Sequence, residues 1–125
     1  MMYISVKLLT KYANPLVNPP WVGDIKPITH EEITEACKNP THPGQEYDAY
    51  YGESRAEHIN RIAWLVVHGW LNDPIEIHMG DAWVIFDGNH RLAAAIYRGD
   101  EMINADVYGS KEKIAVLYQD EGLTT

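Results

Sequence analysis

The chain is poor in cysteine, in long apolar runs and in basic side chains. Its single cysteine, Cys37, excludes an intramolecular disulfide and a zinc site built from several cysteines. The longest apolar run, residues 62–67, has six residues, whereas a membrane-spanning helix needs about 20. Lys7 and Lys11 interrupt the N-terminal stretch, which lacks the continuous apolar region of a signal peptide. We therefore expect a soluble, unexported protein of the cytoplasm with no membrane partner.

Basic side chains are few and unevenly placed. Ten Lys and Arg residues face eighteen Asp and Glu residues, which gives a formal charge of −8. Residues 1–62 hold six basic and eight acidic side chains (−2), and residues 63–125 hold four and ten (−6). Such a balance opposes binding to duplex DNA, to RNA and to anionic membranes. No Lys or Arg lies between Arg61 and Arg91, so Arg91 is a lone fixed positive charge in a long acidic stretch.

The 125 residues fit a single domain, and 46% hydrophobic with 22% charged residues is typical of a globular protein. In the first half, alternation predicts a strand at Tyr3–Leu8. Residues 12–28 follow as an extended loop held by four prolines. A capping box of Thr29 and Glu32 then begins a helix that ends near Lys38. The long segment 39–52 is a candidate lid or binding loop.

The second half predicts an α+β fold, a small mixed sheet with packed helices. A capping box of Ser54 and Glu57 begins a helix that ends at Gly69. We expect its core face to contain Ile59, Ile62, Ala63, Val66 and Val67. The later elements are a hairpin of Pro74–Met79 with Ala82–Asp87, a helix between Gly88 and Gly99, a strand Ile103–Tyr108 and a helix over residues 110–119.

The segment Asp87-Gly88-Asn89-His90-Arg91 is the main candidate for chemistry. A helix that begins directly after a strand-end glycine presents unpaired backbone N–H groups, which favour an anion. Gly88 lacks the Cβ that would keep a phosphate away, and Arg91 offers a bidentate fork. His90 can act as an acid or base, and Asp87 can hold Mg²⁺ or take a proton. The structural alternative is that Asp87 is an ordinary cap and Arg91 forms a surface ion pair.

The sequence also resembles the ParB/sulfiredoxin superfamily over residues 3–108. Its recurrent motif Gly-x-x-Arg-x-x-Ala is matched by Gly88, Arg91 and Ala94, between a hairpin strand and a helix. The order of the surrounding segments also matches: NPPWVGDIKPITHEEI, DPIEI, AWVIFDGNHRLAAAIYRG and INADVYG.

This resemblance implies a nucleotide-phosphate site. Members bind CTP or ATP at the motif's helix start, and related free-serine kinases use a similar Asp-Gly-x-x-Arg turn for phosphoryl transfer. By position, residues 88–91 would bind phosphates, and Asp87 would be the metal or acid–base residue. Sulfiredoxins need a cysteine directly after the motif glycine, where this chain has Asn89, so sulfinic-acid repair is not expected. Only 17 residues follow Tyr108, so we expect no DNA-reading domain as in partition proteins.

Other side chains are weaker candidates. Trp21, in the proline-rich loop, is placed to cover a ligand base, and so are Tyr47, Tyr50 and Tyr51; the alternative is that they pin their loops to the body. Glu53 and Glu57 are dipole partners of a helix start or a general base facing Arg91. The six histidines, none of them paired at i, i+4, are expected to be scattered rather than to bind a metal: His30, His42, His58, His68, His78 and His90.

Three functions remain open. The first is a small enzyme that hydrolyses a nucleotide or transfers its phosphate with Mg²⁺, with Asp87 and His90 as catalytic residues and ATP or CTP as the nucleotide. The second is a non-catalytic, regulatory domain that binds a protein with a complementary basic surface. The third is a ParB-like nuclease, which the negative charge disfavours.

Overall fold

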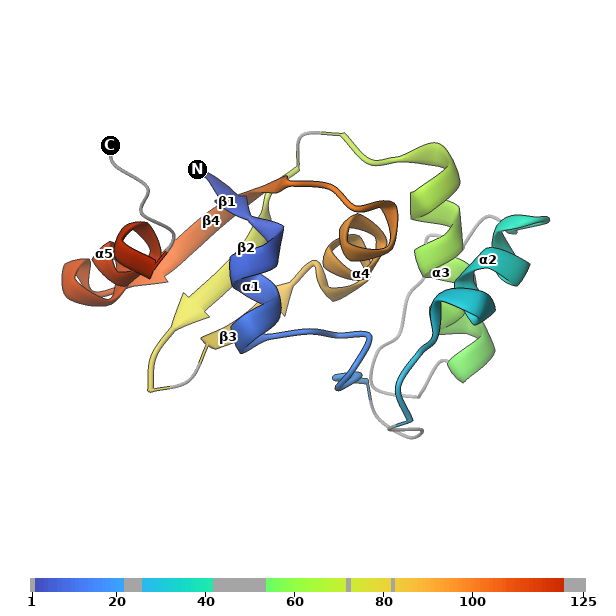
Figure 1. Ribbon diagram of the computed structural model, residues 1–125, viewed down its shortest axis with the longest axis horizontal. Coiled ribbons are helices and arrows are strands. Elements are labelled where there is room, and N and C mark those ends of the chain that lie inside the picture. Colours follow the sequence, from blue (N-terminus) through green and yellow to red (C-terminus); the bar gives the residue numbers. More distant parts are fainter. Residues whose placement is uncertain (1, 22–25, 42–53, 72, 82, 121–125) are drawn as a thin grey trace.

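Helices and strands are interspersed along the chain in the computed structural model, which describes residues 2–21, 26–41, 54–71, 73–81 and 83–120 (Figure 1). In chain order the elements are β1 (Met2–Ser5), α1 (Val6–Tyr12), α2 (His30–Cys37), α3 (Arg55–His68), β2 (Ile75–Met79), β3 (Trp83–Asp87), α4 (Asn89–Arg98), β4 (Met102–Gly109) and α5 (Lys111–Asp120). The predicted α+β composition is confirmed. Among these helices none is long and apolar enough to cross a membrane.

The four strands form one mixed sheet in the order β1-β4-β2-β3. The pairs β1–β4 and β2–β3 are antiparallel, and the central pair β2–β4 is parallel. The predicted hairpin is therefore present, with Met79 opposite Trp83. β3 runs opposite to β2, and β4 runs opposite to β3, so β4 has the direction of β2. The connection from β2 to β4 includes β3 and α4, which is long enough for a parallel pair.

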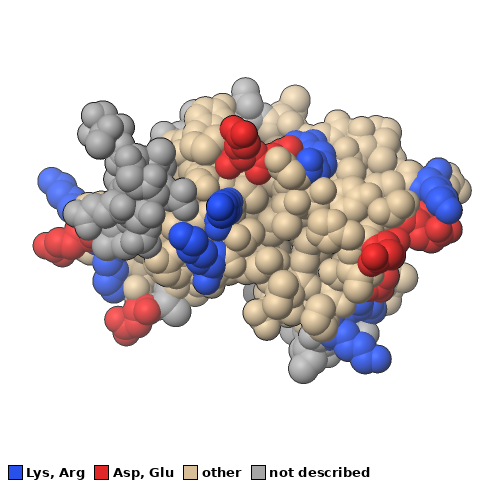
Figure 2. Space-filling model, in the orientation of Figure 1, with Lys and Arg blue, Asp and Glu red and all other residues tan. Residues whose placement is uncertain are grey.

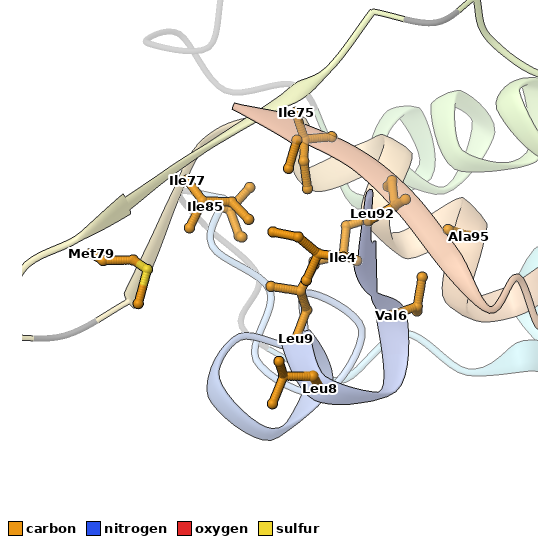
Figure 3. Packing of buried hydrophobic residues seen from close by; sticks show 12 residues of the cluster. Ile4, Val6, Leu8, Leu9, Ile75, Ile77, Met79, Ile85, Leu92 and Ala95 are labelled. Carbon is orange, nitrogen blue, oxygen red and sulfur yellow. The ribbon is translucent and has the colours of Figure 1, made fainter. Parts of the chain in front are cut away.

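One face of the sheet packs against α1 and α4 (Figure 3). Alternate residues of β2, Ile75 and Ile77, point into this core together with Leu8 and Leu9 of α1. Leu92 of α4 joins them and is fully buried. The spacing of two residues in a strand places these side chains on one face, so the other face of the sheet is left for polar and exposed residues.

Helix α4 also belongs to a second core, on the side of α2 and α3. Leu92 and Ala95 pack in the first core, whereas Ala93 and Ala94 pack with residues of the second, such as Ile33 and Ile62. All four α4 residues have no exposed surface. The small size of the three alanines lets other elements approach α4 from both sides, which gives Ala94 of the Gly-x-x-Arg-x-x-Ala pattern a packing role.

Both predicted capping boxes are confirmed. The Thr29 side chain accepts from the Glu32 N–H at the start of α2, and Ser54 accepts from the Glu57 N–H at the start of α3. Gly69 and Gly99 end α3 and α4 with positive φ values of 72° and 76°.

The predicted strand Tyr3–Leu8 is wrong in its second half. β1 ends at Ser5, whose hydroxyl accepts a hydrogen bond of 3.1 Å from the Leu8 N–H and begins α1. Ile4, Val6 and Leu8 alternate as in a strand, but the neighbouring Leu9 is buried too. Two consecutive buried residues fit a helix better than a strand with one covered face.

Of two other predictions, one is wrong and one lies mostly outside the described residues. Val67 was expected in the core of α3 but is 51% exposed. It lies eight residues after Ile59, which at about 100° per residue places it some 80° away around the helix. Segment 39–52, the candidate lid, lies outside the described residues from position 42 onward.

Candidate functional site

The candidate site begins where β3 passes into α4. β3 ends at Asp87, Gly88 adopts φ 108° and ψ 19°, and α4 begins at Asn89. No side chain caps this helix start, because the N-cap residue is a glycine. The turn therefore has the form that the sequence predicts, with the N-terminal N–H groups of α4 directed away from the helix and the positive end of its dipole beside them.

In the structure, packing against β2 explains why residue 88 is a glycine, whereas the sequence suggested the close approach of a phosphate. A Cβ at this position would lie 2.3 Å from Cγ2 of Ile75 and 2.6 Å from its Cβ. The missing side chain thus makes room for the start of β2, and the positive φ independently favours glycine. Gly88 shapes the turn through packing, whatever the turn binds.

Arg91 braces the same turn against the start of β2. Its Nη1 donates to the carbonyl oxygen of Asp73 at 2.8 Å and to that of Pro74 at 3.4 Å. Its Nη2 lies 3.3 Å from Oδ2 of Asp87, and the Arg91 side chain is only 16% exposed. The Asp87 contact is long and its carboxylate is exposed, so this is the bond of Arg91 that a competing anion would replace at least cost.

Asn89 connects the helix start to a cavity of about 260 Å³. Its Nδ2 donates to the Ile85 carbonyl oxygen at 3.1 Å, which fixes the side chain. Tyr12 and Trp83 form a stacked pair in the wall, with ring centroids 4.2 Å apart. The lining residues come from the end of α1, the proline-rich loop, β3 and α4: Tyr12, Ala13, Asn14, Pro15, Asn18, Pro20, Trp83, Val84, Ile85 and Asn89.

Asp87 is the carboxylate that the sequence assigned to Mg²⁺. Its side chain is 73% exposed at the end of β3, beside the start of α4. The described residues contain no group of three or more His, Cys, Asp or Glu side chains that fits a metal ion. One exposed carboxylate fits Mg²⁺ when the ion arrives with phosphate oxygens and water as its other ligands.

His90 is not among the residues that line the cavity, and it forms a pair with His58 of α3. Nδ1 of His58 and Nε2 of His90 lie 2.9 Å apart, within hydrogen-bonding distance. Burial, together with the nearby charges of His58 and Arg61, lowers the pKa of His90 to about 2. His90 is therefore neutral at physiological pH, and in this arrangement it does not supply the positive charge expected at a phosphate site.

Trp21 covers this histidine pair. Its ring stacks on both imidazoles, with centroid distances of 4.5 Å to His58 and 4.4 Å to His90. The side chain predicted to cover a ligand base thus covers two histidines of the protein. The sequence holds no signal for this cluster, because its three members are far apart and follow no common period.

The remaining predicted residues are less informative. Glu57 accepts a hydrogen bond of 3.1 Å from the Ser54 N–H, as a helix-start residue does. Glu53, Tyr47, Tyr50 and Tyr51 lie outside the described residues. On the face shown in Figure 2, the described Lys and Arg side chains are dispersed and do not form a broad basic patch.

Comparison of the chain with protein-family models, curated proteins and solved structures returns no match. The resemblance to the ParB/sulfiredoxin superfamily therefore stays a prediction that depends on the residues of the motif and their order. The fold that surrounds the motif is α+β, with a strand before the turn and a helix after it.

Proposed function

We propose that the chain binds the phosphate groups of a nucleotide at the start of α4. The observation that carries the proposal is the uncapped N-terminus of α4 beside a cavity that Asn89, from its first turn, also lines. Backbone N–H groups at such a start bind phosphate oxygens without any charged side chain.

Arg91 would add charge to this site. When a phosphate takes the place of Asp87, Nη2 turns to the phosphate while Nη1 keeps its bonds to the carbonyl oxygens of Asp73 and Pro74. The two carbonyl oxygens then fix the guanidinium through Nη1, while Nη2 binds the phosphate. A fixed arginine loses little side-chain entropy on binding, which favours affinity.

The cavity beside Asn89 would accept another part of the nucleotide. Its volume is just below the 300–1,000 Å³ of ordinary ligand pockets. The stacked rings of Tyr12 and Trp83 supply an aromatic wall, and Asn14 and Asn18 supply amide groups. This combination of an apolar wall and a few polar groups is typical of sites for a base or a sugar.

Turnover, by hydrolysis or phosphate transfer, is the second part of the proposal. The N–H groups of α4 and Arg91 would stabilise charge on the phosphate in the transition state. Mg²⁺, if it accompanies the nucleotide, would neutralise phosphate charge next to Asp87. Asp87 is the exposed carboxylate at this turn, and it would orient the attacking hydroxyl or water. His90 is a poor acid or base while Trp21 covers it, because such groups work best with a pKa near neutral pH.

A thermal-shift panel tests the binding step. Wild type, Arg91→Ala and Arg98→Ala are each heated with ATP, ADP, CTP, GTP or inorganic phosphate, with and without Mg²⁺. Arg98 is the matched control, because it is an arginine in the last turn of the same helix. A ligand at 100 times its Kd stabilises the fold by about 2.7 kcal/mol, which moves Tm by several degrees.

We expect a shift with at least one nucleotide in wild type and in Arg98→Ala, and a much smaller shift in Arg91→Ala. A product that forms only with Mg²⁺ and disappears in Arg91→Ala would extend the proposal to turnover. Equal shifts in all three proteins, or none in folded wild type, would contradict the site.

A further inference from the structure

A row of three ring side chains crosses the outer face of the sheet, the face opposite α1 and α4. The His78 ring of β2 lies between Phe86 of β3 and Tyr108 of β4, with centroid distances of 4.9 Å and 5.1 Å. Phe86 is 69% exposed and Tyr108 is 51% exposed. Large aromatic side chains in one continuous exposed row are unusual on a protein surface and are typical of a binding surface.

The strand register places carboxylates beside these rings. In the parallel pair of β2 and β4, His78 lies opposite Tyr108, and two residues earlier Glu76 lies opposite Asp106. These residues share the outer face, because the residues between them, such as Ile77, point into the core. Oε2 of Glu76 lies 3.3 Å from Nε2 of His78, so the acidic and aromatic groups are contiguous.

The three strands that form this surface supply no positive charge, and the described Lys113 of α5 pairs with Asp81 in the β2–β3 turn at 3.8 Å. The strands β2, β3 and β4 contain no Lys or Arg. Segments 42–53 and 121–125, which the structure does not describe, contain none either, so neither complements the surface by charge. A second copy of the chain would present the same acidic and aromatic face at a net charge of −8. Nucleic acid would meet carboxylates rather than the cations that its phosphates require.

We propose that the outer face of β2, β3 and β4 binds an arginine- or lysine-containing segment of a protein partner. The cations of that segment lie over the exposed rings of Phe86 and Tyr108 and pair with Glu76 and Asp106. Cations are attracted to the faces of aromatic rings, and neighbouring carboxylates strengthen this attraction. This surface adjoins the nucleotide site, because Glu76 lies opposite Asp87 in the strand register. The proposal does not rest on nucleotide binding, because the phosphate site uses none of Phe86, Tyr108, Glu76 and Asp106.

Fluorescence anisotropy of a short labelled peptide of alternating arginine and glycine tests the proposal at low ionic strength. Phe86→Ala removes an exposed ring and should weaken binding by about two- to fivefold. Val67→Ala is the matched control, because Val67 is an exposed apolar residue on α3.

A second pair of variants distinguishes binding at this surface from a general effect of the protein's net charge. Glu76→Gln and Glu31→Gln remove the same charge, the first beside the rings and the second on the exposed surface of α2. We expect weaker binding in Glu76→Gln only, and shifts of the Phe86 and Tyr108 ring signals in NMR spectra of wild type with the peptide. Equal weakening in both glutamine variants would overturn the proposal, as would a tighter complex with an oligothymidine strand. Self-association of the chain that Phe86→Ala abolishes would overturn it too.

Discussion

The imidazoles of His58 and His90 meet with 2.9 Å between Nδ1 and Nε2. Trp21 stacks on both rings. This contact joins α3 to the first turn of α4, and His90 directly precedes Arg91 in the candidate site. A substitution of His58 or His90 should therefore also affect the turn that we propose binds phosphate.

The buried pair predicts that the protein loses stability in acid. His90 is neutral in the folded state, where its pKa is about 2, but takes up a proton below about 6.5 when unfolded. The contribution of neutral His90 to the free energy of unfolding is therefore complete above pH 6.5 and decreases as the pH falls. From pH 6.5 to pH 5 the free energy of unfolding should decrease by about 2 kcal/mol from this residue alone. Urea unfolding at several pH values measures this.

His90→Asn should remove most of that pH dependence, and His30→Asn, which changes a histidine on the exposed side of α2, should leave it intact. The same loss of stability between pH 6.5 and pH 5 in wild type and in His90→Asn would contradict the assignment.

Trp21→Ala should uncover the pair. Removing the indole lets water reach His90, so its pKa should rise toward the ordinary value of about 6.5. The fold should also lose about 1–3 kcal/mol, because half-buried aromatic contacts disappear. NMR titration of the imidazole C–H signals follows the pKa directly. Trp21→Phe keeps a ring over the pair and should keep the pKa low; an unchanged low pKa in Trp21→Ala would show that Trp21 does not shield His90.

Gly88→Ala should be strongly destabilising for a reason that Gly99→Ala does not share. Both glycines have positive φ, and at such a φ alanine costs about 1–2 kcal/mol. An added Cβ at Gly88 would also meet Ile75 at 2.3 Å, whereas one at Gly99 meets nothing within 4 Å. Chemical denaturation should show Gly88→Ala to be less stable than Gly99→Ala by at least about 2 kcal/mol. Equal losses would mean that Ile75 moves aside freely.

Local signals in the sequence predicted most of the elements. The capping boxes at Thr29 and Ser54 and the glycines after α3 and α4 act through neighbouring backbone groups, so the sequence alone locates them. The start of α1 was missed because Ile4, Val6 and Leu8 fit a strand and a helix nearly equally. The Ser5 cap decides in favour of the helix, and it has no partner glutamate at the third helical position to mark it.

The candidate site was predictable only in part. The strand, glycine and helix around Gly88 follow from local pattern, but the contacts of its side chains depend on tertiary packing. Arg91 bonds to carbonyl oxygens 17 and 18 residues away, and His90 pairs with a residue 32 positions away. Each contact joins α4 to a different segment of the chain, and periodicity describes a single helix or strand, so no sequence pattern indicates them.

Isothermal titration tests the central claim most directly. The nucleotide that gives the largest thermal shift is titrated into wild type, Asn89→Asp and Asn39→Asp. A carboxylate at position 89 is favourable to the dipole of α4, which offsets the lost hydrogen bond to Ile85, so Tm should change little. The same carboxylate repels phosphate, so binding should weaken by at least about tenfold. Asn39→Asp makes the same charge change beyond the end of α2 and should bind like wild type. Equal affinities in all three proteins would contradict a phosphate site at the start of α4.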